Sequence, residues 1–437
     1  MMKARMATLS LMVLLMGILA LGYGGLCDSG SSNNDSGSSA PISSIGRGLV
    51  VYESNYVTST MTASLFSRPA DGSGTPTTLA ASILCGQWSI TKDDNKVVYV
   101  HSAGTGLYGY NVVNIDGTNP LTLTVESSFG YNWDVTDDSS KLIYSNADSS
   151  LNMVPVSGAF TETLASNVNG WEVTLDSTRV VYVDNYSSGT GRLQVADISG
   201  VTPVTATLVS STNGSFDVTP DSTKVVYGES SGAVKVIPIL GGSPVTLSST
   251  SILPYVTPNS AKVIFMETNY DLKIIPIGGG TATNIDSNIN QMYFQVSADS
   301  GWAIYPHDFN GFTSTLVSAS LGSTPLTATL DSGIPFHSAR ITPAGNKVVY
   351  QTNFNLTTGL ADLKVIPING GTITSLVSGI GTMSWGITPD STKILYLDNY
   401  DNNTQTGTLK VIPVSGGSPI TLATGVPSGF GTFAATR

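Results

Sequence analysis

The chain has 437 residues, a length that fits two or three ordinary domains or one large barrel or propeller. Charged residues make up only 11%, well below the quarter or so that is usual in soluble domains. The hydrophobic content of 41% supplies enough apolar surface for a core and excludes global disorder. The net charge of −11 argues against a nucleic-acid partner, because phosphates require a basic surface.

Residues 1–26 have the order of segments expected of a secretory signal peptide. Lys3 and Arg5 form a positive start, residues 9–21 are an almost unbroken apolar run, and small residues follow. The run is shorter than the ~20 residues that a transmembrane helix needs. We therefore expect export, with a membrane-spanning anchor as the alternative.

Cys27 stands where a bacterial lipoprotein carries its lipidated cysteine. The fit to a lipobox is loose, because Leu26 occupies a position where a small residue is expected. Residues 27–46 are rich in Ser, Gly, Asn and Asp, a composition typical of a flexible tether. Lipidation of Cys27 and plain cleavage after Gly24 both stay open, and such an anchor is the only membrane contact that we expect.

From residue 47 onward the sequence repeats with a period of about 43 residues. A threonine or serine marks the same slot in each copy: Thr91, Thr136, Thr174, Thr219, Thr257, Ser297, Thr342, Thr388 and Thr436. An aspartate usually follows two residues later, where its side chain can bond a nearby backbone N–H in a tight turn. Nine copies of one unit therefore make up residues 47–437.

Each unit reads as four short β-strands. The first carries an aromatic residue in most copies, and the second ends in an aromatic residue after β-branched residues. The third ends in proline at Pro155, Pro238, Pro276, Pro367 and Pro413, and the fourth follows a glycine-containing turn. Because proline lacks a backbone donor, it is expected near a strand end.

The two ends of the repeat region complement each other. Residues 49–80 contain the second, third and fourth strands of a unit but lack the first, whereas residues 433–436 match a first strand alone. If the C-terminal strand completes the first unit, the ring closes and two open sheet edges disappear. We predict an all-β, closed β-propeller of nine four-stranded repeats, with eight blades as the alternative.

The segment from Trp385 to Tyr396, with its Thr-Pro-Asp turn and following apolar strand, resembles the TolB-type, WD-like propeller repeat. Residues 114–117 keep the Asn-x-Asp-Gly turn of that family, while most copies carry Gly-Gly at the later turn. The resemblance covers nearly all of residues 47–437. It implies the fold and leaves function open, because the family includes scaffolds, periplasmic assembly proteins and domains appended to peptidases.

No catalytic or metal-binding pattern stands out. The repeat region has no Gly-x-Ser-x-Gly elbow and leaves no residues for a separate hydrolase domain. His101, His307 and His337 lack metal-ligand spacing and read as loop residues. Residues 398–403 offer oxygen ligands but not the twelve-residue calcium pattern, so we expect no cofactor, with Ca²⁺ an open alternative.

Seven cations recur at one slot of the second strand, and we expect them to pair with the turn acids: Lys96, Lys141, Arg179, Lys224, Lys262, Lys347 and Lys393.

An Asn or Asp followed by an aromatic residue recurs just beyond the second strand. The aromatic members are Tyr56, Tyr186, Tyr270, Phe309, Phe354 and Tyr400. Such rings give a large contact area at low entropy cost, so they are our candidate ligand-binding residues. The alternative is that each ring covers its own blade.

Together these patterns predict an exported, monomeric, non-enzymatic binding or scaffolding propeller of the bacterial cell envelope or exterior. The expected partner is an envelope protein or a glycan, held through one loop face. The alternative is a propeller enzyme of lactonase, lyase or hydrolase type with its site at the central channel. An enzyme would show converging carboxylates or histidines there, whereas a binding protein would show exposed aromatic residues and amides.

Overall fold

The computed structural model describes residues 48–437, except 105–106, 127–131, 201, 250, 290–292, 336–337, 356, 382–383, 402 and 429–430. The predicted signal peptide, Cys27 and the tether lie outside these residues, as does His337. Throughout the described ranges the regular elements are all β-strands. No helix in that part of the chain is long and apolar enough to cross a membrane.

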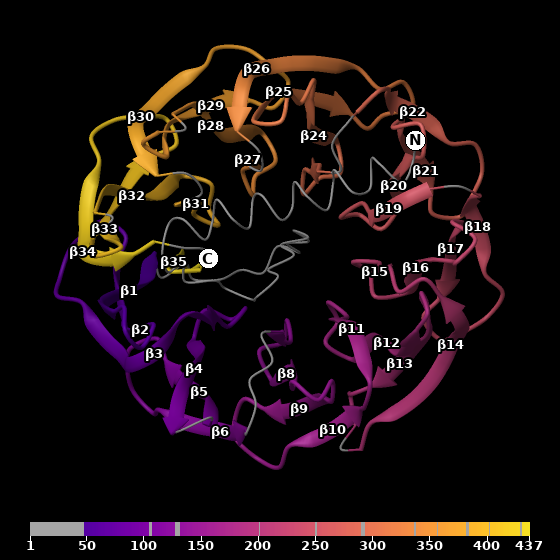
Figure 1. Cartoon of the computed structure of the whole chain (residues 1–437), viewed down its shortest axis with the longest axis horizontal. Coiled ribbons are helices and arrows are strands. Elements are labelled where there is room, and N and C mark those ends of the chain that lie inside the picture. The colour runs from indigo at the N-terminus through magenta and orange to yellow at the C-terminus, as the bar shows by residue number, and fades with distance from the viewer. Residues whose placement is uncertain are drawn as a thin grey trace.

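The strands form a ring of four-stranded blades, numbered here along the chain (Figure 1). Blade 1 consists of β35 (Phe433–Ala435), β1 (Leu49–Val57), β2 (Thr62–Pro69) and the first half of β3 (Thr77–Ile90). Blade 2 has the second half of β3, β4 (Lys96–Gly104), β5 (Leu107–Asn114) and β6 (Leu121–Glu126). Blade 3 has β7 (Trp133–Val135), β8 (Lys141–Ser145), β9 (Leu151–Pro155) and β10 (Glu162–Ala165).

The next three blades repeat this order. Blade 4 has β11 (Val168–Val173), β12 (Arg179–Ser187), β13 (Thr190–Asp197) and β14 (Val204–Thr212). Blade 5 has β15 (Phe216–Val218), β16 (Lys224–Gly228), β17 (Val234–Pro238) and β18 (Val245–Ser248). Blade 6 has β19 (Ser251–Val256), β20 (Lys262–Glu267), β21 (Leu272–Pro276) and β22 (Thr283–Asp286).

The last three blades complete the ring. Blade 7 has β23 (Gln295–Val296), β24 (Trp302–His307), β25 (Thr313–Ser320) and β26 (Thr327–Pro335). Blade 8 has β27 (Ala339–Ile341), β28 (Lys347–Asn355), β29 (Leu360–Pro367) and β30 (Thr374–Gly381). Blade 9 has β31 (Trp385–Ile387), β32 (Lys393–Asp401), β33 (Thr406–Pro413) and β34 (Ile420–Pro427).

Hydrogen bonding divides the described strands into eight sheets, seven of four strands and one of seven. The seven-stranded sheet is blades 1 and 2 joined through β3, which pairs first with β2 and then with β4. All nine predicted repeats are therefore present as four-stranded units, and two of them share one strand. The prolines predicted near strand ends lie at the last position of the third strand.

The predicted closure of the ring is confirmed. Strand β35 pairs antiparallel with β1, with Ala435 opposite Val50 and Phe433 opposite Tyr52. The N–H of Glu53 donates to Thr432 O at 2.9 Å, and the N–H of Thr436 donates to Leu49 O at 3.0 Å. The C-terminal strand thus supplies the inner strand that blade 1 lacks.

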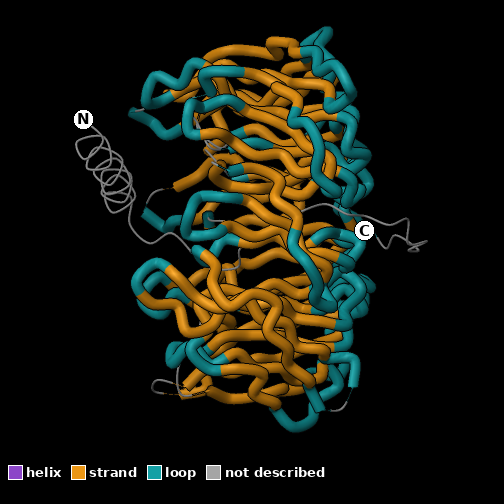
Figure 2. The backbone as a smooth tube through the Cα atoms, turned by 90° about the vertical axis from the view of Figure 1, so that its right-hand side faces the viewer, coloured by secondary structure: helices purple, strands orange, loops and turns teal. Residues whose placement is uncertain are grey.

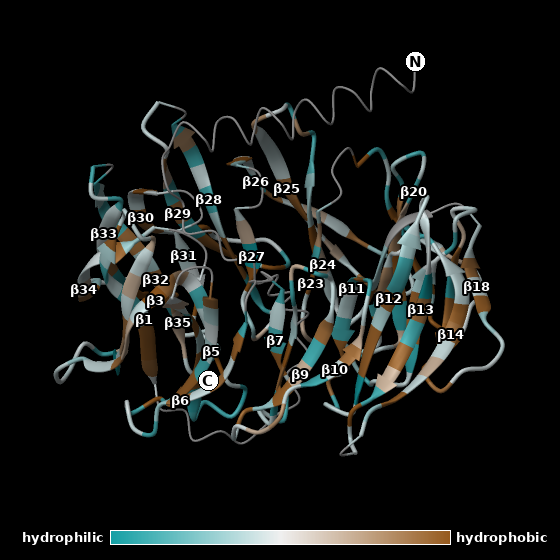
Figure 3. Cartoon of the chain, turned by 60° about the horizontal axis from the view of Figure 1, so that its bottom comes forward, coloured by the Kyte–Doolittle hydropathy of each residue, from teal (hydrophilic) through white to brown (hydrophobic). Residues whose placement is uncertain are grey.

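The hydrophobic core is divided among the boundaries between blades. Each pair of neighbouring blades encloses one cluster of buried apolar side chains, including the pair formed by blades 9 and 1. Between blades 2 and 3, for example, the rings of Tyr110 and Trp133 lie 6.2 Å apart in an edge-to-face contact. In Figure 3 the apolar segments accordingly run along the strands.

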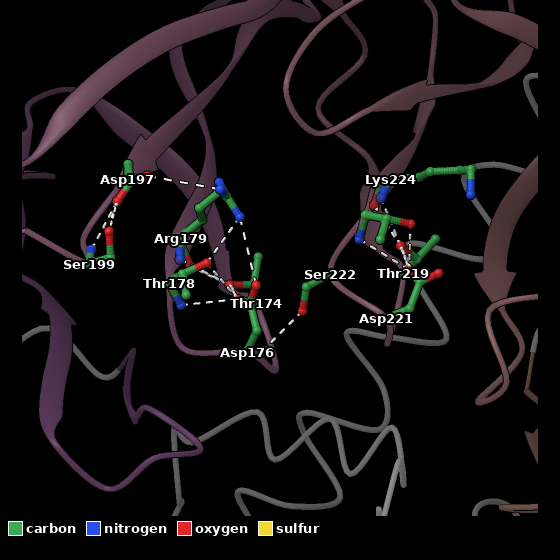
Figure 4. A network of polar contacts seen from close by, with 11 residues as sticks. Thr174, Asp176, Thr178, Arg179, Asp197, Ser199, Thr219, Asp221, Ser222 and Lys224 are labelled. Carbon is green, nitrogen blue, oxygen red and sulfur yellow. Dashed lines mark hydrogen bonds and ion pairs between the residues drawn. The ribbon is translucent and has the colours of Figure 1, made fainter.

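A polar link also joins neighbouring blades (Figure 4). The hydroxyl of Thr174 donates to Asp176 Oδ1 at 2.6 Å, and Ser222 of the next blade accepts the N–H of Asp176 at 3.0 Å. The same serine contact recurs at Ser139, Ser177, Ser260, Ser300 and Ser391. The tight turn formed by the slot threonine and the residue two positions later, usually an aspartate, therefore links each of these blades to the next.

The expected pairing of second-strand cations with turn acids is found in one blade of the described chain, where Arg179 lies 3.7 Å from Asp176. At the other slots no such ion pair forms among the described residues. The turn carboxylates accept hydroxyl and backbone N–H groups instead, as Asp221 does from Thr219 and Thr223. These nearby donors satisfy the carboxylate without ordering a long lysine side chain.

Candidate functional site

Because neighbouring strands of a blade are antiparallel, their connections alternate between the two rims of the ring. Figure 2 shows the loops gathered along both rims. We call the rim that carries the loops between second and third strands the hairpin face, and the opposite rim the turn face. All six aromatic residues predicted to bind a ligand lie in the last residues of the second strand or just beyond it, so they belong to the hairpin face.

The Asn or Asp before each aromatic residue has a backbone role. Asn55, Asn185, Asp308, Asn353 and Asn399 adopt φ values between 50° and 57°, a region that Asn and Asp tolerate better than most residues. In blades 1, 4, 8 and 9 the pairing of second and third strands shifts register at this point. The recurrent pair is therefore a β-bulge, which re-aims the side chain that follows. Blade 6 differs, because Tyr270 itself has φ of 68°.

The six predicted rings differ in exposure. Tyr186 and Tyr270 are 40% and 45% exposed, whereas Tyr56, Phe309, Phe354 and Tyr400 are half-buried. The same face also exposes Met61 by 56% and Phe312 by 62%. The hairpin face thus presents apolar side chains from several blades. The sequence pattern did not predict Met61 and Phe312, which are more exposed than any of the six predicted rings.

Tyr186 serves its own blade in part. Its hydroxyl donates to Asn213 O at 3.0 Å, and its ring lies over Gly214, where an added Cβ would come within 2.8 Å. The ring therefore covers the connection between blades 4 and 5 while its remaining surface faces solvent. The contacts of Tyr186 fit the covering role, and ligand binding through its exposed surface stays a prediction.

Tyr56 and Tyr400 meet where the ring closes. Burial raises the pKa of Tyr56, and the nearby Glu53 and Tyr400 raise it further, so the side chains of blades 1 and 9 are neighbours here. The Tyr56 hydroxyl oxygen is buried and has no hydrogen-bond partner among the described residues. An unsatisfied buried hydroxyl costs free energy.

The two described histidines lie in different blades and do not form a shared site. His101 lies in blade 2 beside Asn111, and His307 lies in blade 7, where its Nδ1 is 2.9 Å from Asp308 Oδ1. No group of three or more His, Cys, Asp or Glu side chains in the described chain is arranged to hold a metal ion.

The loop at residues 398–403, considered for Ca²⁺, bonds internally. Asp398 lies 2.5 Å from Lys410 Nζ, and Asp401 accepts the N–H of Asn403 at 2.8 Å. The loop carboxylates therefore contact the chain's own donors.

The sequence analysis missed a group of polar side chains on the innermost strands. They occupy the slot after the first-strand aromatic residue: Asp134, Glu172, Asp217, Tyr255, Gln295 and Arg340. Several reach the inner strand of the next blade. Glu172 Oε2 accepts the N–H of Val218 at 3.1 Å, Asp217 Oδ2 accepts that of Val256 at 2.6 Å, and Gln295 accepts that of Ile341 at 3.0 Å.

Three of these carboxylates come from consecutive blades and repel one another. Burial raises the pKa of Glu172, and the Asp217 and Asp134 carboxylates raise it further. Burial likewise raises the pKa of Asp217. Burial and repulsion together favour the protonated form of Glu172. The sequence did contain a signal for this group. Acidic residues stand at the same slot of three successive inner strands, where a packed strand would usually carry apolar residues.

Glu53 is a second buried acid that the sequence analysis missed. Its side chain is fully buried, and Oε1 accepts the N–H of Gly86 at 2.6 Å and the indole N–H of Trp88 at 2.8 Å. Burial raises its pKa to about 8, against the lowering effect of these hydrogen bonds. Glu53 thereby anchors the bend in β3 between blades 1 and 2.

Comparisons with known proteins agree with this architecture. No family model matches the sequence, and no curated protein matches it. Among solved structures, a eukaryotic initiation factor is 10% identical, with 86% of this chain and 96% of that chain covered and a TM-score of 0.58. TolB from Acinetobacter baumannii is 15% identical over 64% of this chain and 79% of that chain, with a TM-score of 0.34.

An oligogalacturonate lyase in complex with manganese is 12% identical over 69% of this chain and 92% of that chain, with a TM-score of 0.43. Identities this low indicate a shared fold only, and of these three structures only the initiation factor has a TM-score above 0.5. The chain is a β-propeller. A particular role therefore has to be argued from the chain's own residues.

Proposed function

We propose that this chain is a non-enzymatic binding or scaffolding propeller that engages a protein or glycan through its hairpin face. The observation that carries the proposal is the exposure of Tyr186 and Tyr270 together with Met61 and Phe312 on that one rim. Exposed rings and flexible apolar side chains are the usual anchors of recognition surfaces. We also propose that the chain is exported, that Cys27 carries a lipid anchor, and that its repeat is of the TolB type.

A central enzyme site is the second candidate, and the acids Asp134, Glu172 and Asp217 are the observation in its favour. Two of them, however, already accept backbone N–H groups of the next blade. Those bonds give the carboxylates a structural role, so the binding function has the stronger support.

The test uses residues 47–437 as soluble bait for an envelope extract and a glycan array. Tyr186→Ala and Tyr270→Ala should each weaken capture about tenfold, as expected for an aromatic anchor of an interface. Phe160→Ala is the matched control, because Phe160 is 91% exposed but lies on the turn face. Circular dichroism should show unchanged strand content in all three variants.

Equal capture by the two tyrosine variants and the unmodified chain would overturn the proposal. Absence of any protein or glycan would do the same, and a hydrolase and lyase screen with Glu172→Gln as a negative control would then test the second candidate.

A further inference from the structure

Acidic side chains outnumber basic ones on the hairpin face. The acids beside these hairpins are Asp148, Asp184, Glu229, Glu267, Asp271, Asp308, Asp362, Asp398 and Asp401, and the cations are Arg192, Lys235, Lys273, Lys364 and Lys410. A surface with an excess of one sign attracts partners of the other sign and speeds their association.

The cations of this face are already paired. Arg192 lies 2.6 Å from Asp184, and Lys235 lies 2.6 Å from Glu229. The other three pairs are Lys273 with Glu267 at 2.7 Å, Lys364 with Asp331 at 3.6 Å, and Lys410 with Asp398 at 2.5 Å. The face therefore has no spare cation among the described residues to neutralise its other acids.

The remaining carboxylates of blades 6 to 9 bond to neutral groups. Asp271 accepts the amide of Asn269 at 2.8 Å, and Asp362 accepts that of Asn353 at 2.7 Å. Asp401 accepts the N–H of Asn403 at 2.8 Å, and hydrogen bonds from Asn403 lower the pKa of that carboxyl. Asp308 lies 2.9 Å from His307, which is charged only when protonated. These hydrogen bonds orient the carboxylates but leave their charge in place.

In each of these four consecutive blades an aromatic residue also adjoins, in the sequence, either the carboxylate or the asparagine that bonds it. Tyr270 precedes Asp271, Phe309 follows Asp308, and Tyr400 precedes Asp401. In blade 8, Phe354 follows the Asn353 that bonds Asp362. Phe312 adds a further exposed ring in blade 7. An aromatic face next to a carboxylate suits a guanidinium or ammonium group, which the ring quadrupole and the negative charge both attract.

The turn face lacks this combination. Its turn aspartates accept nearby hydroxyl and backbone N–H groups, and these bonds outweigh the effect of burial on their pKa. Lysines of the second strand lie close enough to lower the pKa of Asp138, Asp221 and Asp390 further. Acid and base are therefore interspersed there, whereas the described lysines beside the hairpins of blades 6, 8 and 9 are already held in ion pairs.

We propose that the hairpin face of blades 6 to 9 binds a segment of a partner protein that carries lysine or arginine side chains. The inference rests on the proposed function and narrows its partner from protein or glycan to a cationic protein segment. Asp271, Asp308, Asp362 and Asp401 take the cationic groups, and Tyr270, Phe312 and their neighbours stack on the side chains. A neutral sugar would gain nothing from the excess charge.

The test measures binding of the full chain to a synthetic peptide of alternating Arg and Ser residues, at low and at raised salt. Peptides with Glu or Asn in place of Arg serve as probes of charge. The Arg peptide should bind, and added salt should weaken it, because exposed charges are screened. The triple substitution Asp271→Asn, Asp308→Asn and Asp401→Asn should weaken binding about tenfold, since each exposed ion pair contributes a few-fold.

The matched control is Asp71→Asn with Asp197→Asn on the turn face, where each carboxylate accepts a backbone N–H two residues on. It removes two negative charges, against three in the triple substitution, and should change binding less than about twofold, which separates a local site from attraction to the whole acidic chain. Tyr270→Phe should keep the affinity, whereas Tyr270→Ala should lose several-fold.

Equal binding of the Arg and Asn peptides, or equal weakening by the triple and control variants, would overturn the inference. If a partner captured by the bait depends on Tyr186 and Tyr270 but not on the three aspartates, the proposed function stands and the cationic partner falls. If nothing is captured and no peptide binds, both fall.

Discussion

Ser222 shows how a single side chain joins two blades. It is buried, adopts φ of 58° and accepts the N–H of Asp176 from the preceding blade. A left-handed backbone usually favours glycine, so the hydroxyl is the reason for a serine here. Blade 8 has Gly345 at the same slot.

Replacing Ser222 with Ala should destabilise the ring by about 1–2 kcal/mol, because the N–H of Asp176 would be buried without an acceptor. The urea midpoint measures the change, and Ser230→Ala, at an exposed position of the same blade, is the control. Ser222→Gly should lose less, since glycine relieves the left-handed backbone. An unchanged midpoint for Ser222→Ala would show that the link contributes nothing.

Glu53 should make stability fall with rising pH. Its folded pKa of about 8 lies above the reference value of 4.5, so the folded state holds a proton that the unfolded state releases. The resulting stabilisation is complete below about pH 4.5 and is lost as pH rises toward 8.

Glu53→Gln should remove this contribution, which is on the order of a few kcal/mol, and flatten the profile of unfolding free energy between pH 5 and 8 or so. The glutamine oxygen can accept both N–H groups that Oε1 now accepts. A variant as sensitive to pH as the unmodified chain would refute this role of Glu53.

At the scale of elements, outer strands and closure decide whether the ring holds together. In every blade the pairing of third and fourth strands contains a register shift. Bulges twist an exposed edge and make it a poor template for another strand. The nine outer edges are thus blunted by one device, which the repeat pattern did not reveal because a bulge depends on cross-strand register.

Strand β35 is the element whose loss should matter most. Removing residues 431–437 would expose the unpaired edge of β1 and open the cluster between blades 9 and 1. We expect the thermal midpoint to fall by at least several degrees, since one kilocalorie per mole shifts it by about 2–4 °C in a chain of this class. A synthetic peptide of residues 431–437 should restore part of the loss. A truncated chain as stable as the intact one would mean that closure does not stabilise the ring.

Across the whole molecule, the repeat places chemically different residues at equivalent positions of the blades. The inner slot holds Asp134, Glu172 and Asp217 in one arc and Gln295 and Arg340 in another, where Arg340 lies 5.1 Å above the Trp385 ring. The hairpin face likewise differs from blade to blade in exposure and charge. Function in a repeat scaffold resides in such departures from the repeat.

The strand order, the nine repeats and the closure by the C-terminal strand could all be predicted from the amino-acid sequence. These features follow from local signals, namely alternating apolar residues, turn aspartates, glycines and strand-ending prolines, which act within a few residues. The sequence did not reveal that Tyr186 is exposed while Phe354 is half-buried, or that Glu172 reaches Val218. Nor did it reveal that Asp271 forms no ion pair with another described residue. Each of these depends on contacts across a blade or between neighbouring blades, and the local pattern of one strand contains no information about the side chains that it will meet there.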